Sequence, residues 1–168
     1  MKRVLVIDTT ILCVWLNVPG MTPCGPENDQ WDNDRVQTKI DEEIQQGTLF
    51  VLPLASIIET GNHITHVHGD NYGLVNQFAD FILNAADGNI PWAAFTAQST
   101  LWSQDGLKAL AQRWRITAIS GQSMGDASIV DVAEYYAQAG CEVEILTADS
   151  GLRSYQPSSP IYVPRRRL

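Results

Sequence analysis

Residues 4–10 read Val-Leu-Val-Ile-Asp-Thr-Thr, and this stretch decides the fold. Four consecutive apolar β-formers without polar alternation are typical of a strand buried on both faces, as in the middle of a parallel sheet. Ligands of open α/β sheets bind beyond the carboxyl ends of the strands, so Asp8 lies where chemistry is usually done. Thr9 and Thr10 then open the next helix. The stretch therefore predicts a central strand with a candidate functional acid at its end.

The composition predicts one globular domain over residues 1–168. These 168 residues, 45% of them hydrophobic, suffice for one full core but not for two. No run of eighteen apolar residues is present, and the first strand begins and breaks too early for a signal peptide. We therefore expect a cytoplasmic protein without a membrane segment. The three cysteines form no CxxC pair and indicate neither a disulfide framework nor a zinc site.

The charge of the chain limits how it could bind nucleic acid. The net charge of −8 argues against a strong sequence-independent grip on phosphates, which Lys and Arg provide. A nucleic-acid enzyme of this charge would need metal cations at its site or a basic protein partner over its surface. The tail over residues 157–168 holds a dense basic cluster that could bind RNA or simply be a solvated terminus: Arg165, Arg166 and Arg167.

Strands and helices are expected to alternate after the first strand, which is typical of an α/β domain with a mostly parallel sheet. Further strands are expected over residues 48–52, 115–119, 142–147 and 161–163. Helices are expected over residues 10–16, 35–46, 53–69, 71–86, 97–114 and 126–139.

A polar excursion over residues 17–46 interrupts this pattern. Its first part, residues 17–34, is rich in Pro, Gly, Asn and Asp, and we expect it on the surface, with Trp31 as a candidate for stacking on a base. The helix that follows is expected to be capped by Asp34. Its expected solvated face consists of Lys39, Asp41, Glu42 and Glu43.

A parallel sheet would bring carboxylates that lie at element ends to one edge, and there are four of them: Asp8, Glu59, Asp126 and Asp149. The last three also have structural explanations. Glu59 fits a Ser-x-x-Glu capping box with Ser56. Asp126 suits the positive end of a helix dipole, and Asp149 could cap a short turn. Asp126, however, shares a helical face that is otherwise apolar, so its carboxylate is expected to point toward the buried side and to need a partner.

Other polar residues near these acids are expected to be ordinary surface groups. Asp131 and Glu134 lie on the helix of Asp126 but are turned away from it, so we expect them to be solvated. His63 follows Glu59 by four residues on the same face, and we expect it to be exposed near the end of that helix.

Four short motifs, in this order, resemble those of the PIN-domain ribonucleases, whose best-known small members are the bacterial VapC-type toxins. The motifs are Val4-Leu5-Val6-Ile7-Asp8-Thr9-Thr10, Leu54-Ala55-Ser56-Ile57-Ile58-Glu59, Gly125-Asp126-Ala127 and Ile145-Leu146-Thr147-Ala148-Asp149-Ser150-Gly151-Leu152. The resemblance implies a PIN-like three-layer domain with a central, mostly parallel five-stranded sheet of order 3-2-1-4-5, flanked by helices. It also implies that the acids named above bind a divalent metal, and it gives Thr147 the role of the family's Thr-x-Asp threonine.

Carboxylates and waters are the ligands that Mg²⁺ and Mn²⁺ prefer. Two such ions about 4 Å apart can activate a water and stabilise the leaving oxygen of a phosphodiester. We expect Asp8 and Asp149 to hold the principal ion, and Glu59 and Asp126 to complete its shell or to recruit a second ion. Thr10 or Thr147 would orient a carboxylate or a water through its hydroxyl.

These expectations combine into a Mg²⁺- or Mn²⁺-dependent endoribonuclease that hydrolyses single-stranded or structured RNA. The resemblance extends this to the toxin of a toxin–antitoxin pair, with a basic antitoxin as partner and with self-association into a homodimer. A non-catalytic PIN-like module that binds a protein partner is the alternative from another class. A phosphatase of the haloacid dehalogenase type also begins with such a strand, but that family has a second acid at the position of Thr10.

Overall fold

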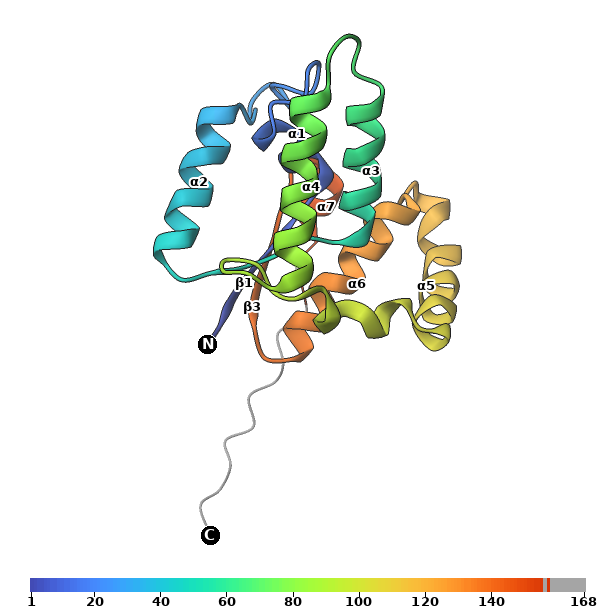
Figure 1. Cartoon of the computed structure of the whole chain (residues 1–168). Coiled ribbons are helices and arrows are strands. Elements are labelled where there is room, and N and C mark those ends of the chain that lie inside the picture. The colour runs from blue at the N-terminus through green and yellow to red at the C-terminus, as the bar shows by residue number, and fades with distance from the viewer. Residues whose placement is uncertain (156, 158–168) are drawn as a thin grey trace.

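A parallel sheet of three strands forms the centre of the protein (Figure 1). The computed structural model describes residues 1–155 and 157. In spatial order the strands are β2 (Leu49–Val51), β1 (Arg3–Ile7) and β3 (Glu142–Leu146). Val4 of β1 is in register with Leu49 and with Val143. The predicted central strand and the α/β class with a parallel sheet are confirmed.

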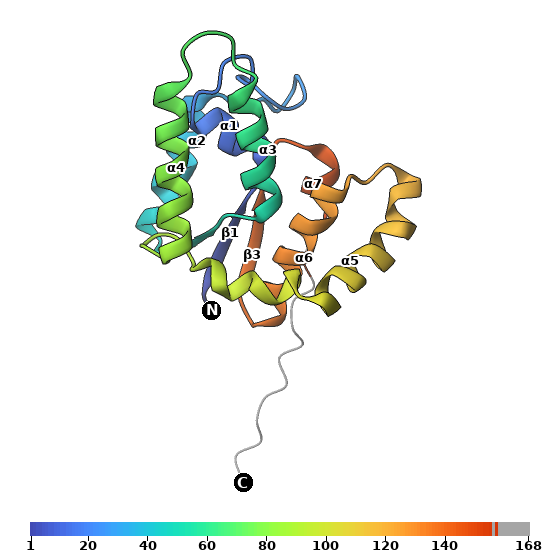
Figure 2. The ribbon, with the colours of Figure 1, turned by 45° about the vertical axis from the view of Figure 1, so that its right-hand side comes forward.

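Helices flank the sheet on both faces (Figures 1 and 2). One face is covered mainly by α1 (Thr9–Trp15), α2 (Asn33–Gln45), α3 (Leu54–Thr65) and α4 (Tyr72–Asp87). The other face is covered by α6 (Met124–Gln138), α7 (Ser150–Ser154) and the 3-10 helix η1 (Phe95–Trp102). Helix α5 (Gln104–Thr117) packs on the outside of α6 and η1 (Figure 2). No helix in the described part of the chain is long and apolar enough to cross a membrane.

The alternation of side chains along β1 explains why its apolar residues are consecutive. Leu5 and Ile7 pack into the cluster beneath α1, α2 and α4, whereas Val4 and Val6 pack into the cluster beneath α6. All four side chains are fully buried. Burial of one such side chain stabilises the fold by about 1.5–3 kcal/mol, so a polar residue on either face of this strand would be costly.

The sheet has fewer strands in the described residues than the five that the resemblance implied, since only three form there. Residues 115–119, expected as a strand, end α5 and form the 3-10 turn η2 (Ala118–Ser120). Ile116 and Ile119 lie three residues apart and are 73% and 89% exposed, so they lack the burial that would hold a strand in the sheet. The strand expected over residues 161–163 lies outside the described residues.

The first part of the polar excursion packs against the protein more than expected. Val18 and Trp31 are buried, and Trp31 forms an antiparallel bridge with Cys24. The guanidinium carbon of Arg35 lies 3.9 Å from the centroid of the Trp31 ring, so the protein itself covers this ring. Trp31 is therefore not the exposed stacking platform that the sequence suggested.

Asp29 fastens this excursion beside the carboxyl ends of the strands. Its Oδ1 lies 2.7 Å from Nη1 of Arg35, and its Oδ2 pairs with Nη1 of Arg153 on α7. Arg153 also donates from Nη2 to the carbonyl oxygen of Thr147, at 3.3 Å. The loop is thereby tied to the segment that links β3 to α7.

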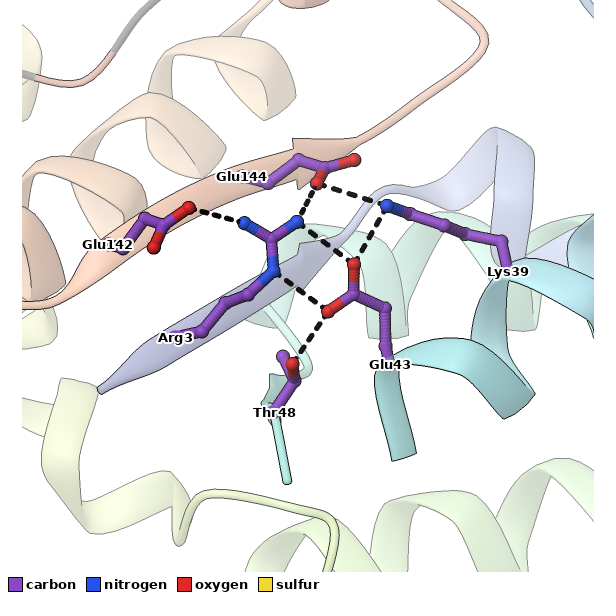
Figure 3. Close-up of polar contacts among 6 residues, drawn as sticks. All are labelled: Arg3, Lys39, Glu43, Thr48, Glu142 and Glu144. Atoms are coloured by element: carbon purple, nitrogen blue, oxygen red, sulfur yellow. Dashed lines mark hydrogen bonds and ion pairs between the residues drawn. The ribbon is translucent and has the colours of Figure 1, made fainter. Parts of the chain in front are cut away.

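Helix α2 is fixed to the sheet by a network of charges around Glu43 (Figure 3). Arg3 at the start of β1 approaches Glu43 through Nε and Nη2, each at 2.9 Å from a carboxylate oxygen. Lys39 Nζ lies 2.8 Å from Glu43 Oε1, and Thr48 Oγ1 donates to Oε2 at 2.6 Å. Only 2% of the Glu43 side chain is exposed, so this carboxylate is almost completely enclosed by its partners.

The expected solvated face of α2 is therefore wrong for Lys39 and Glu43, which turn toward the sheet, and holds for Asp41 and Glu42, which are exposed. Sequence spacing missed this because the partner charge, Arg3, is far away along the chain. The cap also lies two residues earlier than expected, because the side chain of Asp32, rather than Asp34, accepts a hydrogen bond from the backbone N–H of Arg35.

Candidate functional site

Asp8 lies at the carboxyl end of β1, where it also caps α1. The residue is 4% exposed, and its carboxylate accepts three hydrogen bonds from the described residues, all at Oδ2. The donors are the hydroxyls of Thr10 and Thr147, each at 2.7 Å, and the backbone N–H of Thr10 at 3.4 Å. No described donor reaches Oδ1. One oxygen of this buried carboxylate is thus held in place, and the other is available for a ligand.

Thr10 and Thr147 join the ends of β1 and β3 through Asp8. The hydroxyl of Thr10 accepts from the backbone N–H of Ala148 at 3.1 Å, and the hydroxyl of Thr147 accepts from the backbone N–H of Asp149 at 2.9 Å. Each hydroxyl donates to Asp8 and accepts from the segment after β3, so each is oriented from two sides. The structure places both predicted supporting threonines against Asp8.

Asp149 follows β3 and is exposed. Its Oδ1 accepts from the backbone N–H of Leu152 at 2.9 Å, so Asp149 caps α7. The sequence offers such a cap as the structural explanation of this acid. Its Oδ2 accepts nothing from the described residues. Capping and ligand binding are compatible here, because each uses a different oxygen.

Glu59 reaches the same edge from the first half of α3. Its Oε2 accepts from the hydroxyl of Thr9 at 2.9 Å. The capping box with Ser56 does not form, because Pro53 precedes the helix as its cap and Ser56 donates instead to the carbonyl oxygen of Ile7, at 2.9 Å. Glu59 is therefore directed toward α1 and the end of β1 rather than back along its own helix.

Asp126 lies in the first turn of α6, next to Gly125, and is half-buried. Burial raises the pKa of its carboxyl above the usual range, hydrogen bonding by Ser123 opposes this rise, and the negative charges of Asp8 and Asp149 add to it. Asp126 thus lies within electrostatic range of both acids. The sequence predicts a partner for this half-buried carboxylate, and no Lys, Arg or His among the described residues pairs with it.

The four predicted acids therefore come from four different elements to one edge of the sheet, as expected. Their donor chemistry suits Mg²⁺ or Mn²⁺, since Asp8 Oδ1 and Asp149 Oδ2 are unoccupied by described donors. The described residues hold no group of three or more His, Cys, Asp or Glu side chains close enough to form a metal cage. An ion held by one or two carboxylates and several waters, as is usual for Mg²⁺, needs no such cage.

Several candidates lie apart from this edge. Arg165, Arg166 and Arg167 lie outside the described residues, and His63 is exposed as expected. The expectation of a solvated face is wrong for Asp131, which pairs with Arg113 of α5, and for Glu134, which accepts from the hydroxyl of Tyr155. Both acids are partly buried because α5 and the segment after α7 pack over them.

Sequence reasoning missed two residues that touch Glu59. The sequence predicts that Thr9 opens a helix, but it does not predict that the Thr9 hydroxyl binds Glu59. It gives Gly125 only as a motif position, although the lack of a side chain there leaves room for the Glu59 carboxylate. The sequence did indicate that both could matter, because Thr9 directly follows Asp8 and Gly125 directly precedes Asp126.

No family model matches this chain, and neither the curated proteins nor the solved structures include a significant match to it.

Proposed function

We propose that this protein is a metal-dependent endoribonuclease of the PIN type, which hydrolyses phosphodiester bonds with Mg²⁺ or Mn²⁺ at the carboxyl edge of its sheet. The observation that supports this most is the convergence of the four acids named above at one edge, with a buried Asp8 that the described residues hold through one oxygen only. A buried carboxylate with a free oxygen, beside other carboxylates, is unfavourable unless a cation is bound.

In this proposal Asp8 and Asp149 hold the principal ion through Oδ1 and Oδ2, while Glu59 and Asp126 bind the waters around it or help to hold a second ion. The bound ion would supply an activated water and stabilise the charge on the leaving oxygen. Thr10 and Thr147 hold Oδ2 of Asp8 and so orient its free oxygen, Oδ1, for a ligand. Burial and the acidic neighbours raise the pKa of the Asp126 carboxyl, and a bound cation would oppose that rise.

Single-stranded or structured RNA as substrate is the finer part of the proposal, and it is supported only by the motif resemblance. The same holds for a role as the toxin of a toxin–antitoxin pair and for a homodimer. A cytoplasmic location and a basic antitoxin are also part of the proposal, and they rest on composition and charge. A basic partner would suit the net charge of −8.

Incubation of the purified protein with a labelled single-stranded RNA of mixed sequence tests the proposal. We expect cleavage with Mg²⁺ or Mn²⁺ and none in EDTA, because none of the four carboxylates pairs with a Lys or Arg among the described residues, and Arg153 nearby is paired with Asp29. A matched DNA strand and a structured RNA, run in parallel, identify the substrate class.

Full cleavage in chelator would contradict the metal-dependent mechanism. Absence of cleavage for every nucleic acid tested, together with tight binding of a protein partner, would favour the alternative of a PIN-like binding module.

A further inference from the structure

The carboxylate of Glu59 is contacted from two sides. On one side the hydroxyl of Thr9, a residue that is 5% exposed and lies next to Asp8, donates to Oε2 at 2.9 Å. On the other side Oε1 lies against the backbone of Gly125, the second residue of α6 and the neighbour of Asp126. Glu59 itself comes from α3, so its side chain bridges the starts of α1 and α6.

The structure requires glycine at position 125 because of space and not because of conformation. The backbone of Gly125 does not have the positive φ that favours glycine, so any residue could adopt it. A Cβ built there would collide with Glu59 Oε1 and would lie 3.3 Å from Glu59 Cδ. The third nearest atom, Ser123 Oγ, is at an ordinary contact distance of 3.7 Å. The space that a side chain would fill is therefore the space that the Glu59 carboxylate occupies.

The obstacle to a larger residue is the far end of a flexible side chain. A methyl group at position 125 would push the carboxylate of Glu59 aside, since a rotation of that side chain costs less than a shift of the α6 backbone. The displaced carboxylate would leave the hydroxyl of Thr9. Helix α6 itself would not suffer, because alanine is a better helix former than glycine.

We infer that Gly125 and Thr9 are positioning residues that together hold the Glu59 carboxylate at the acidic edge, by which we mean the carboxyl edge of the sheet where the four acids lie. Gly125 acts because it has no side chain in the space that the carboxylate occupies, and Thr9 acts because its hydroxyl donates to the carboxylate. This inference rests on the proposed function for its consequence, namely that a correctly placed Glu59 is needed for tight binding of the divalent ion. The position of the Glu59 carboxylate does not depend on that consequence, because it can be tested in the protein without metal.

The test compares Gly125→Ala with the parent by isothermal titration with Mn²⁺ and by cleavage of single-stranded RNA. We expect an unchanged or higher melting temperature without metal. We also expect about a 10-fold or greater loss of Mn²⁺ affinity and a lower kcat, the size of effect typical for residues that orient metal ligands. Gly73→Ala is the matched control, because Gly73 is also the second residue of its helix, α4, and a Cβ there would meet nothing within 4 Å.

A shorter acid at position 59 distinguishes a steric effect on Glu59 from any other effect of the methyl group. Glu59→Asp removes one methylene and hence the collision, so the added Gly125→Ala change should reduce Mn²⁺ affinity by less than about 2-fold in that background. Likewise Thr9→Val should weaken Mn²⁺ binding, whereas Thr9→Ser, which keeps the hydroxyl, should bind like the parent.

The inference would be overturned if Gly125→Ala bound Mn²⁺ as tightly as the parent does. It would also be overturned if the Gly125→Ala change reduced Mn²⁺ affinity by the same factor in the parent and in Glu59→Asp. If the parent neither binds Mn²⁺ nor cuts RNA, the proposed function fails first. Crystal structures of the parent and of Gly125→Ala then decide the inference alone, since it predicts a Thr9–Glu59 hydrogen bond in the parent and its loss in the variant.

Discussion

Replacement of Asp8 by asparagine is expected to reduce the cleavage of single-stranded RNA by about 100-fold or more. The variant loses the negative charge that would hold the cation at the centre of the site, and groups that stabilise charge in a transition state contribute about 10²–10³ in rate. The fold should persist, because the amide oxygen can still accept from Thr10 and Thr147, and asparagine caps a helix as well as aspartate does.

The control is Asp105→Asn, which removes an exposed acid from the first turn of α5, away from the acidic edge. Both variants should show the circular dichroism of the parent, and only Asp8→Asn should lose activity. If Asp8→Asn cuts RNA as fast as the parent, Asp8 is a helix cap and a hydrogen-bond acceptor and nothing more.

Replacement of Glu43 by glutamine is expected to lower the free energy of unfolding by about 3–5 kcal/mol, the usual effect of breaking a buried ion pair. Glu43 is almost fully buried among Arg3, Lys39 and Thr48, so the variant removes the most buried anion of the network. Arg3 and Lys39 then keep only more exposed partners, Glu144 for both and Glu142 for Arg3. For a protein of this size such a loss corresponds to a fall of about 10 °C in melting temperature. Glu42→Gln, one residue away on the exposed face of α2, should change little.

The effect of Glu43 should also depend on pH. Its bond from Arg3 holds the pKa of the Glu43 carboxyl at about 2, below the 4.5 of a free glutamate, and Lys39 and Thr48 act in the same direction. The stability it contributes is complete above about pH 4.5 and is lost as pH falls toward about 2. Urea unfolding of parent and variant should therefore converge in this range. A gap that is as large at about pH 2 as at neutral pH would mean that packing, not charge, carries the effect.

Local pattern was enough to predict the centre of this fold. The consecutive apolar residues of β1 could satisfy burial on both faces only as a central strand, and Asp8 followed directly from the end of that strand. The four acids were expected at one edge because parallel strands place all their carboxyl ends together. The structure brings Asp126 within electrostatic range of Asp8 and Asp149, and it places Glu59 against their neighbours Thr9 and Gly125.

The errors arose where distant contacts decide the structure. Glu43 looked solvated because its partner Arg3 is 40 residues away. Trp31 looked exposed because the core cluster that it joins is built from residues far along the chain, Leu5 and Leu146 among them. Residues 115–119 carry apolar residues at a spacing that suits both a strand and a helix end, and their exposure decided for the helix. The role of Gly125 depends on a side chain from another helix, which no local pattern encodes.

The central claim is that the carboxyl edge of the sheet binds a divalent cation through Asp8. A crystal structure of the protein grown with Mn²⁺, with anomalous difference density measured at the manganese edge, tests this most directly. We predict a manganese ion bonded at about 2 Å to Asp8 Oδ1, with at least one further acid of the edge and waters around it. Crystals grown at saturating Mn²⁺ that show no manganese at this edge, or manganese only at other acids of the surface, would contradict it.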